Sequence, residues 1–244
     1  MLPLDGFRLV EATGTDAGRW LQDLVTANVI ALEPGTAVRS LLLGPTGRIR
    51  ADLHVLRRPE GYLLVQALDQ PTDVGALLAP YVLSSDVRLE QAPAGDLVAI
   101  PGSPTWWFAS AGPDGSVPVG PPAVESWRIR RGLPRFPLDL DEDSLPAEGG
   151  LDDEVTIDRA KGCYLGQETV AKVRNLGHPT RVVLALEADG TVEAGTPVLA
   201  EGDEVGLVTS ADTLGGASTL LARVRWQARG AALRTPSGTP LRRR

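Results

Sequence analysis

Residues 161–168 read KGCYLGQE, and this stretch contains the only cysteine among 244 residues. The chain has only two lysines, Lys161 and Lys172, and both lie in or just after the same stretch. Gly162 and Gly166 flank the thiol closely and permit tight backbone turns around it. The composition therefore directs attention to Cys163, either as a functional thiol or as a small buried hydrophobe.

The residues that follow Cys163 predict a helix. The stretch LGQETVAKVRN, residues 165–175, has helical character from about Leu165 or Gly166 onward. A cysteine just ahead of a helix N-terminus lies where free amide groups and the helix dipole favour an anion, and Lys161 adds positive charge nearby. We therefore predict that Cys163 is functional, with a buried structural cysteine as the alternative.

The residues around Cys163 exclude two familiar kinds of thiol chemistry. A phosphatase loop needs an arginine six residues after its cysteine, and position 169 is threonine. A cysteine protease needs a histidine base, and His54 and His178 are the only histidines, the latter in a Gly-His-Pro turn. The GPTG stretch at 44–47 predicts an ordinary turn, because it lacks the lysine of a phosphate-binding loop. What remains is a reactive or ligand-binding cysteine.

Composition and charge limit the class of protein. Hydrophobic residues make up 43% of the chain, which is enough for a packed core. We expect a cytoplasmic protein, because no long apolar run predicts a membrane helix and the first residues do not resemble a signal peptide. A net charge of −7 argues against nucleic acid as a direct partner. One cysteine excludes an internal disulfide, and no metal site is predicted. We expect Arg242–Arg244 to form a frayed tail.

The first half of the chain mixes strands and helices without a regular βαβ repeat, which predicts an α+β fold built on antiparallel sheet. The expected strands are residues 7–12, 37–44, 47–56, 61–68, 87–90, 97–100 and 106–109. We expect helices after Asp16, around Trp20 to Val25, and from Pro71 to Leu83.

The chain changes character after a Pro/Gly-rich stretch at 112–122. A helix is expected at AVESWRIRRG, residues 123–132, and from Arg181 onward short strands follow at close spacing. These strands predict a small β-barrel or sandwich of about 65 residues. The expected domains are an α+β region at 1–178, with a possible subdivision near 92–122, and a C-terminal β-barrel at 179–244.

The stretch KGCYLGQE resembles the signature of the YgfZ family, Lys-Gly-Cys-(Tyr/Phe)-x-Gly-Gln-Glu, and every fixed position agrees. This family is related to the folate-binding T-protein of the glycine cleavage system, GcvT. The resemblance extends to WLQDLVTANVIALEPGTAVRSLLLGPTGRIRADLHVL, to GYLLVQALDQPTDVGALL, and to WRIRRGLPRF with LPAE. It covers nearly the whole chain and is weakest between about 92 and 122.

The resemblance implies a GcvT-like fold of pseudo-symmetric α+β domains and a C-terminal β-barrel in a ring around a folate channel. It implies tetrahydrofolate, or a folate derivative, as the bound ligand, and a role in assembling or repairing iron-sulfur proteins. Cys163, supported by Lys161, is then the reactive thiol, and a cluster contact is transient because one cysteine cannot hold a cluster. The implied partners are iron-sulfur client or assembly proteins, and the chain is expected to be a monomer. Any effect on tRNA modification is then indirect, through an iron-sulfur enzyme.

The resemblance also assigns residues to the folate ligand. Tyr164, Gln167 and Glu168 belong to the signature, while Arg128 and the Glu148 of LPAE match family positions. The aminomethyltransferase relatives have two aspartates in a stretch like GGILDDLIV. The matching residues GRIRADLHV keep Asp52 and have Ala51 in the other place, so Asp52 is the candidate ligand contact, with an ordinary exposed strand aspartate as the alternative.

Two other functions stay open. One is a tetrahydrofolate-dependent aminomethyl or one-carbon transferase, which the missing second aspartate and the lack of a Gly-Tyr-Thr-Gly-Glu segment disfavour. The other is a passive folate-binding module in which Cys163 is structural. Whether the chain has catalytic turnover is left undecided by its residues.

Overall fold

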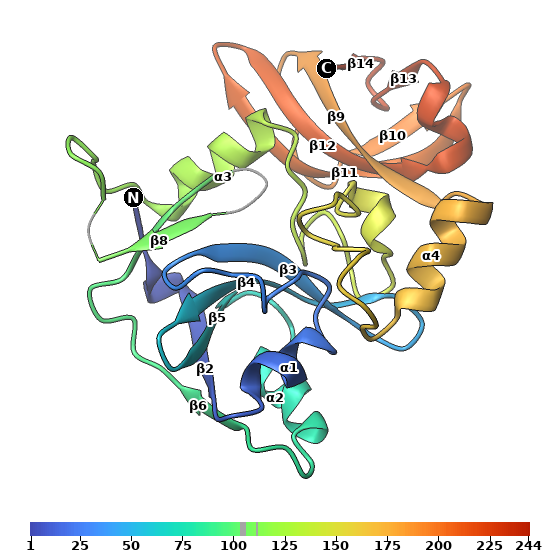
Figure 1. The fold of residues 1–244 in the computed structure, drawn as a ribbon. Helices are drawn as coiled ribbons and strands as arrows, with labels where there is room; N and C mark the ends of the chain where they lie inside the picture. Colours follow the sequence, from blue (N-terminus) through green and yellow to red (C-terminus); the bar gives the residue numbers. More distant parts are fainter. Residues whose placement is uncertain (103–105, 111) are drawn as a thin grey trace. The chain divides into compact units, whose positions relative to one another are not determined.

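The computed structural model describes residues 1–102, 106–110 and 112–244 (Figure 1). The chain divides into two compact units. The first contains Met1–Pro121 and Asp152–Thr169, and the second contains Pro122–Leu151 and Val170–Arg244. Residues 103–105 and 111, which fall in the predicted subdivision near 92–122, lie outside the described residues. The predicted domain boundary between 178 and 179 stays a prediction.

A five-stranded antiparallel sheet forms the centre of the first unit. Its strand order is β3-β4-β5-β2-β6. The strands are β2 at Phe7–Thr13, β3 at Ala37–Leu43, β4 at Ile49–Arg58, β5 at Gly61–Ala67 and β6 at Arg88–Gln91. These strands confirm the sequence-based assignments to within a few residues, because apolar runs between turn signals identify sheet strands well.

Two short helices cover one face of this sheet: α1 at Ala17–Gln22 and α2 at Val74–Leu78, the latter followed by a 3-10 turn at Ala79–Tyr81 (Figure 1). They bury Leu21 and Leu78 against sheet residues such as Leu53. The helix predicted from Pro71 to Leu83 is too long. It begins only after Asp73, whose carboxylate accepts from the Ala76 amide at 3.0 Å, and it tightens at Pro80, which has no N–H to continue the α-helix.

The other face of the five-stranded sheet carries different side chains. Ala51 and Leu53 belong to the core under the helices, and alternation along β4 therefore turns Asp52 and His54 to the opposite face. There the His54 ring stacks on Trp106, with centroids 5.0 Å apart, and meets Phe108 edge-on. Phe108 lies in a small antiparallel sheet of order β1-β7-β8. Its strands are β1 at Leu2–Pro3, β7 at Val98–Ile100 and β8 at Trp107–Ala109, and a 3-10 turn occupies Leu4–Gly6.

The second unit contains a closed six-stranded antiparallel barrel of order β10-β11-β12-β9-β14-β13 (Figure 1). The strands are β9 at Arg181–Asp189, β10 at Pro197–Ala200, β11 at Asp203–Leu214, β12 at Ala217–Arg225, β13 at Leu233–Arg234 and β14 at Pro240–Arg243. The prediction of a small C-terminal barrel is confirmed. The prediction of a frayed tail is wrong, because Arg242 and Arg243 pair with β9 and close the barrel.

The remaining helices connect these parts. Helix α3 spans Pro121–Arg130, 3-10 turns occupy Pro146–Gly149 and Trp226–Gly230, and α4 spans Gln167–Leu176. The division between the two units falls inside α4, after Thr169. Sheets and helices that are segregated in this way confirm the predicted α+β class.

Candidate functional site

Cys163 is exposed and forms no disulfide. It lies in a segment of the first unit, residues 156–168, which ends in the first turn of α4 and which we call the thiol loop. Gly162 and Gly166 hold positive φ angles of 102° and 82° on either side of the cysteine. Such angles are strained for residues with a Cβ, so the glycines set the path of the loop. An exposed thiol can react with, or bind metal from, another molecule.

Lys161 fastens the thiol loop to the turn that follows α1. Its ammonium group donates to the carbonyl oxygens of Gln22, Val25 and Ala27, the last two at 2.5 and 3.0 Å. Carbonyls at the end of a helix have no partner within the helix, and a lysine satisfies them well. Burial lowers the pKa of Lys161 to about 8, although Asp23 and Asp158 oppose the shift. The side chain therefore remains charged at neutral pH and is directed into this carbonyl cluster.

A network of buried polar groups joins the same two segments. The Thr26 hydroxyl donates to the Thr156 carbonyl at 2.7 Å and accepts from the Leu41 amide at 2.9 Å. The Asp158 amide donates to the Thr26 carbonyl at 3.1 Å, and the Asp158 carboxylate accepts from the Lys161 amide at 3.1 Å. Thr26 is completely buried. Sequence reasoning missed this network, and a buried threonine next to an apolar helix was the only signal for it.

The GPTG turn at 44–47 supports the other end of the thiol loop. A Cβ at Gly166 would lie 2.6 Å from the Gly44 carbonyl oxygen and 3.0 Å from the Gly47 Cα. A Cβ at Gly47 would in turn lie 2.7 Å from the Thr169 Cβ. The two glycine-containing turns therefore approach more closely than side chains would allow. The interpretation of GPTG as an ordinary turn overlooked this supporting contact.

The other signature residues differ in exposure. Tyr164 is buried, its ring centre lies 5.6 Å from the Lys161 ammonium nitrogen, and burial raises the pKa of its hydroxyl. Gln167 is the first residue of α4, where its amide donates to the Tyr164 carbonyl at 3.3 Å. Glu168 is exposed in the first turn of α4. Cys163 and Glu168 are therefore exposed to solvent, whereas the side chains of Lys161 and Tyr164 are directed into the protein.

Asp52 lies on β4 of the first unit and forms an ion pair with Arg39. The Arg39 Nε and Nη2 atoms lie 3.0 and 2.6 Å from the two carboxylate oxygens. The Gln70 side chain accepts from the Asp52 amide at 3.0 Å and donates to the Asp52 carbonyl at 2.6 Å, as a neighbouring strand would. Asp52 is only 9% exposed. This carboxylate is therefore held in one orientation and is not an ordinary exposed strand aspartate.

Arg128 and Glu148 both lie in the second unit, and both are buried. The Arg128 Nη1 donates to Asp139 at 2.7 Å and its Nη2 to the Ser210 hydroxyl at 2.8 Å. Glu148 accepts from the Arg223 Nη2 at 2.8 Å. Arg128 and Glu148 thus both have hydrogen-bond partners within the protein, and their contact with folate stays a prediction.

Within residues 1–102, 106–110 and 112–244, no three His, Cys, Asp or Glu side chains are grouped so that they could hold a metal ion. None of the helices in this part of the chain is long and apolar enough to cross a membrane.

Comparison with known proteins gives two kinds of sequence relative. The chain is 28% identical over 205 residues to the mitochondrial iron-sulfur cluster assembly factor IBA57 homologue of Pyricularia oryzae, a match covering 70% of the chain and 52% of that protein. It is 25% identical over 253 residues to the aminomethyltransferase of Rubrobacter xylanophilus, covering 81% of the chain and 68% of that protein. The chain thus spans about half of the assembly factor's length. No family model matches it.

Among solved structures, the glycine cleavage system aminomethyltransferase T of Bartonella henselae superposes with a TM-score of 0.77 at 17% identity. The superposition covers 98% of this chain and 83% of that one. The chain therefore has the fold of aminomethyltransferase T, and its sequence is similar both to aminomethyltransferases and to iron-sulfur cluster assembly factors.

Proposed function

We propose that this chain is a tetrahydrofolate-binding accessory protein for the assembly or repair of iron-sulfur proteins, and that Cys163 is its reactive thiol. The YgfZ-like signature favours an assembly factor over a transferase. The observation that carries the proposal is the exposure of the only thiol on a loop that Lys161 fastens in place. The similarity to an iron-sulfur cluster assembly factor over 70% of the chain supports it.

The chemistry of the thiol agrees with a transient role. Cysteine binds iron through its thiolate sulfur. Iron-sulfur clusters are generally held by four protein ligands, and this chain has one cysteine. A cluster bound at Cys163 would therefore need ligands from a client or assembly protein. In this proposal Lys161 is a positioning residue.

The residues of the chain fit a folate in one specific respect. Each Asp52 carboxylate oxygen is bonded to Arg39 once, and a carboxylate oxygen has a further lone pair. Asp52 can therefore accept a hydrogen bond from an N–H group of the pterin ring while Arg39 and Gln70 hold it in place. Bound folate would supply a one-carbon carrier. Arg128, Glu148, Tyr164, Gln167 and Glu168 are further proposed contacts, taken from the resemblance.

The decisive experiment for the iron-sulfur role uses cells that lack the protein. Wild type, Cys163→Ala and Cys163→Ser are expressed at matched levels, and the activity of an iron-sulfur enzyme is measured. Ser84→Ala, an exposed small side chain outside the thiol loop, is the matched control. We expect wild type and Ser84→Ala to restore activity and both cysteine variants to fail. Restoration by Cys163→Ala would contradict the role of the thiol, and failure of wild type would contradict the iron-sulfur role.

Folate binding is tested separately by calorimetry with purified protein and tetrahydrofolate. We expect Asp52→Asn to weaken binding about tenfold, because one charge-assisted hydrogen bond contributes roughly 1.5–3 kcal/mol. Asp114→Asn removes an exposed carboxylate elsewhere and should bind as wild type does. Equal affinity of wild type and Asp52→Asn would remove Asp52 from the folate site.

A transferase is the second candidate, favoured by the aminomethyltransferase fold and sequence relatives. Against it, position 51 is an alanine that is completely buried in the core beneath the helices. The Ala51-Asp52 pair therefore has one carboxylate where the transferases have two, because alanine has none. Formation of methylene-tetrahydrofolate from tetrahydrofolate and an aminomethyl donor would favour the transferase over the accessory role. Normal function of Cys163→Ala with intact folate binding would instead favour a passive folate-binding module.

A further inference from the structure

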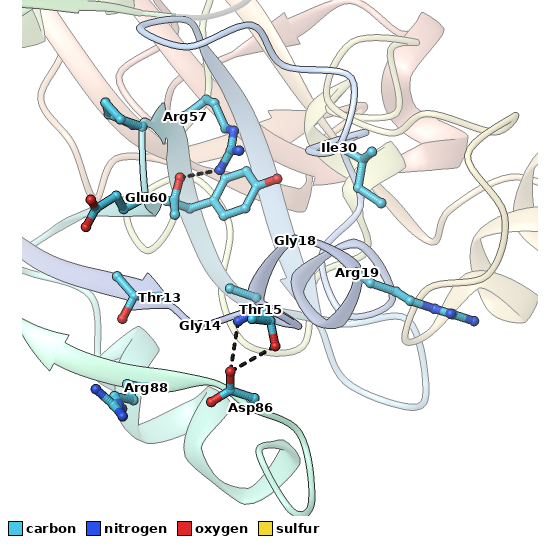
Figure 2. Close-up of a pocket in the computed structure, with 14 residues that line it drawn as sticks. Thr13, Gly14, Thr15, Gly18, Arg19, Ile30, Arg57, Glu60, Asp86 and Arg88 are labelled. Atoms are coloured by element: carbon cyan, nitrogen blue, oxygen red, sulfur yellow. Dashed lines mark hydrogen bonds between the residues drawn. The ribbon is translucent and has the colours of Figure 1, made fainter.

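An open cavity of about 800 Å³ lies in the first unit, on the side of the sheet that carries α1 (Figure 2). Its walls come from the end of β2, the start of α1, the turn between β4 and β5, and the residues before β6. None of the residues assigned to folate or to the thiol loop lines it. We call it the arginine cleft, after Arg19, Arg57 and Arg88 in its walls.

The three arginines come from three different elements, and their guanidinium groups have N–H donors without an acceptor. Arg19 and Arg88 are exposed, and within the described residues neither guanidinium group has a hydrogen-bonded or ion-paired partner. Arg57 donates to the Gly61 carbonyl at 2.8 Å and lies 4.7 Å above the Tyr62 ring, which leaves other N–H groups of its fork available. The cleft therefore offers several unused cationic donors.

The acidic residues of the cleft neutralise this charge only in part. The Asp86 carboxylate accepts from the Thr15 amide at 3.1 Å and from the Thr15 hydroxyl at 2.8 Å. These two hydrogen bonds, and to a smaller extent the charge of Arg88, lower the pKa of Asp86, and Figure 2 shows its carboxylate turned toward Thr15. Glu60 is the other acid of the cleft and is exposed at its edge. The arginines thus outnumber the carboxylates.

The placement of the charges favours an extended ligand. In Figure 2, Arg19 and Arg88 lie at opposite edges of the cleft with their side chains extending outward, while Arg57 lies over the Tyr62 ring. A ligand that contacts both Arg19 and Arg88 therefore spans the cleft. Ile30, which is 56% exposed, lies at the rim and offers an apolar contact next to these charges. An extended chain with several carboxylates and one apolar side chain matches this arrangement.

We propose that the arginine cleft binds an extended acidic peptide segment of a partner protein, with an apolar side chain of the segment against the exposed Ile30. Since the whole chain has a net charge of −7, an acidic peptide is repelled at long range. Specific binding of such a peptide must therefore come from the local charge of the cleft. This inference is independent of the folate and iron-sulfur proposals.

The test uses fluorescence anisotropy with a labelled acidic peptide of about 12 residues that has one central leucine. The double variant Arg19→Glu/Arg88→Glu reverses the two cleft charges that have no hydrogen-bonded or ion-paired partner within the described residues. Arg225→Glu/Arg234→Glu reverses two exposed arginines of the barrel and gives the same net charge. At about 50 mM salt we expect saturable binding by wild type and by the barrel variant, and binding at least about tenfold weaker by the cleft variant.

Several outcomes would overturn the proposal. Absence of saturable binding by wild type, or equal weakening by the cleft and barrel variants, would show that the cleft does not recognise the peptide. Full displacement of the peptide by inorganic phosphate at matched ionic strength would show a small-anion site instead. Thermal unfolding of each variant checks the fold. Ile30→Ser should weaken binding of the leucine peptide and leave unchanged the binding of a peptide with serine in that place.

Discussion

The Nζ atom of Lys161 lies 3.0 Å from the carbonyl oxygen of Ala27, a residue 134 positions earlier in the chain. Two more carbonyls, those of Gln22 and Val25, accept from the same ammonium group. One of only two lysines in the protein therefore joins the thiol loop to the end of α1. Its position explains why a lysine precedes Cys163 without requiring that the ammonium act on the thiol.

The first prediction concerns this contact. Lys161→Met should lower the free energy of unfolding by about 2 kcal/mol, because hydrogen bonds from a charged group are lost and the carbonyls are left unpaired. Lys172→Met, which removes an exposed lysine of α4, should cost less than about 1 kcal/mol. Denaturant unfolding measures both. If Lys161→Met were as stable as Lys172→Met, the anchoring role would be wrong.

The same pair of variants tests how the thiol loop is ordered. The rate at which Cys163 reacts with a thiol reagent should change in Lys161→Met, because the loop then samples more conformations. The rate should stay as in wild type for Lys172→Met. An unchanged rate in both variants, together with lost stability in Lys161→Met, would show that Lys161 stabilises α1 without ordering the loop.

The second prediction compares two glycines of the thiol loop. Gly162→Ala should cost about 1 kcal/mol, because its φ of 102° is strained for alanine but no atom lies within 4 Å of the new Cβ. Gly166→Ala should cost at least about 3 kcal/mol, because its Cβ also meets the Gly44 carbonyl oxygen at 2.6 Å. Thermal and denaturant unfolding of both variants give the difference. Equal losses would mean that the turn at 44–47 does not press on the loop.

The third prediction concerns acid stability and His54. Its Nε2 atom is buried without a hydrogen-bond partner in the described residues, and burial lowers the pKa of His54 to about 3. The nearby Asp52 opposes this shift and Arg39 adds to it. Between pH 6.5 and 3 the unfolded chain then binds a proton that the folded chain does not. Stability is therefore lost as the pH falls through this window, by up to about 1.4 kcal/mol per pH unit.

The test of this prediction is His54→Phe, measured by denaturant unfolding at several pH values. The variant should lose less stability on acidification than wild type, because phenylalanine has no proton to bind. His178→Phe, at the exposed histidine, is the matched control and should resemble wild type. If His54→Phe lost as much stability on acidification as wild type, His54 would take up its proton in the folded protein over the same pH range as in the unfolded chain.

The fourth prediction compares two arginines of α3 in the second unit. Arg128→Met should cost about 3–5 kcal/mol, because it leaves the carboxylate of Asp139 buried without its cation. Arg130→Met breaks a more exposed pair with Asp212 and should cost about 1 kcal/mol or less. Denaturant unfolding distinguishes them. A small loss in Arg128→Met would mean that Asp139 keeps its hydrogen bonds to Thr209 and Ser210 and needs no cation.

The fold was predictable where the pattern is local. Strands β2 to β5 follow from apolar runs between turn residues, and the barrel follows from short strands at close spacing. The closure of the barrel was not predictable, because β14 is short and rich in arginine. It is ordered by pairing with β9, where Arg242 lies opposite Glu187 and also forms an ion pair with Asp189.

The candidate site likewise has features that are predictable from local sequence and features that depend on contacts between distant segments. Composition and short-range spacing settle three points: Cys163 is the only thiol, glycines lie on either side of it, and a helix follows. Three contacts are visible only in the folded chain: Lys161 binds backbone carbonyls, Gly166 meets the turn at 44–47, and Gln70 holds Asp52. These contacts join segments distant in the sequence, and their energies depend on burial and distance, which no local pattern encodes.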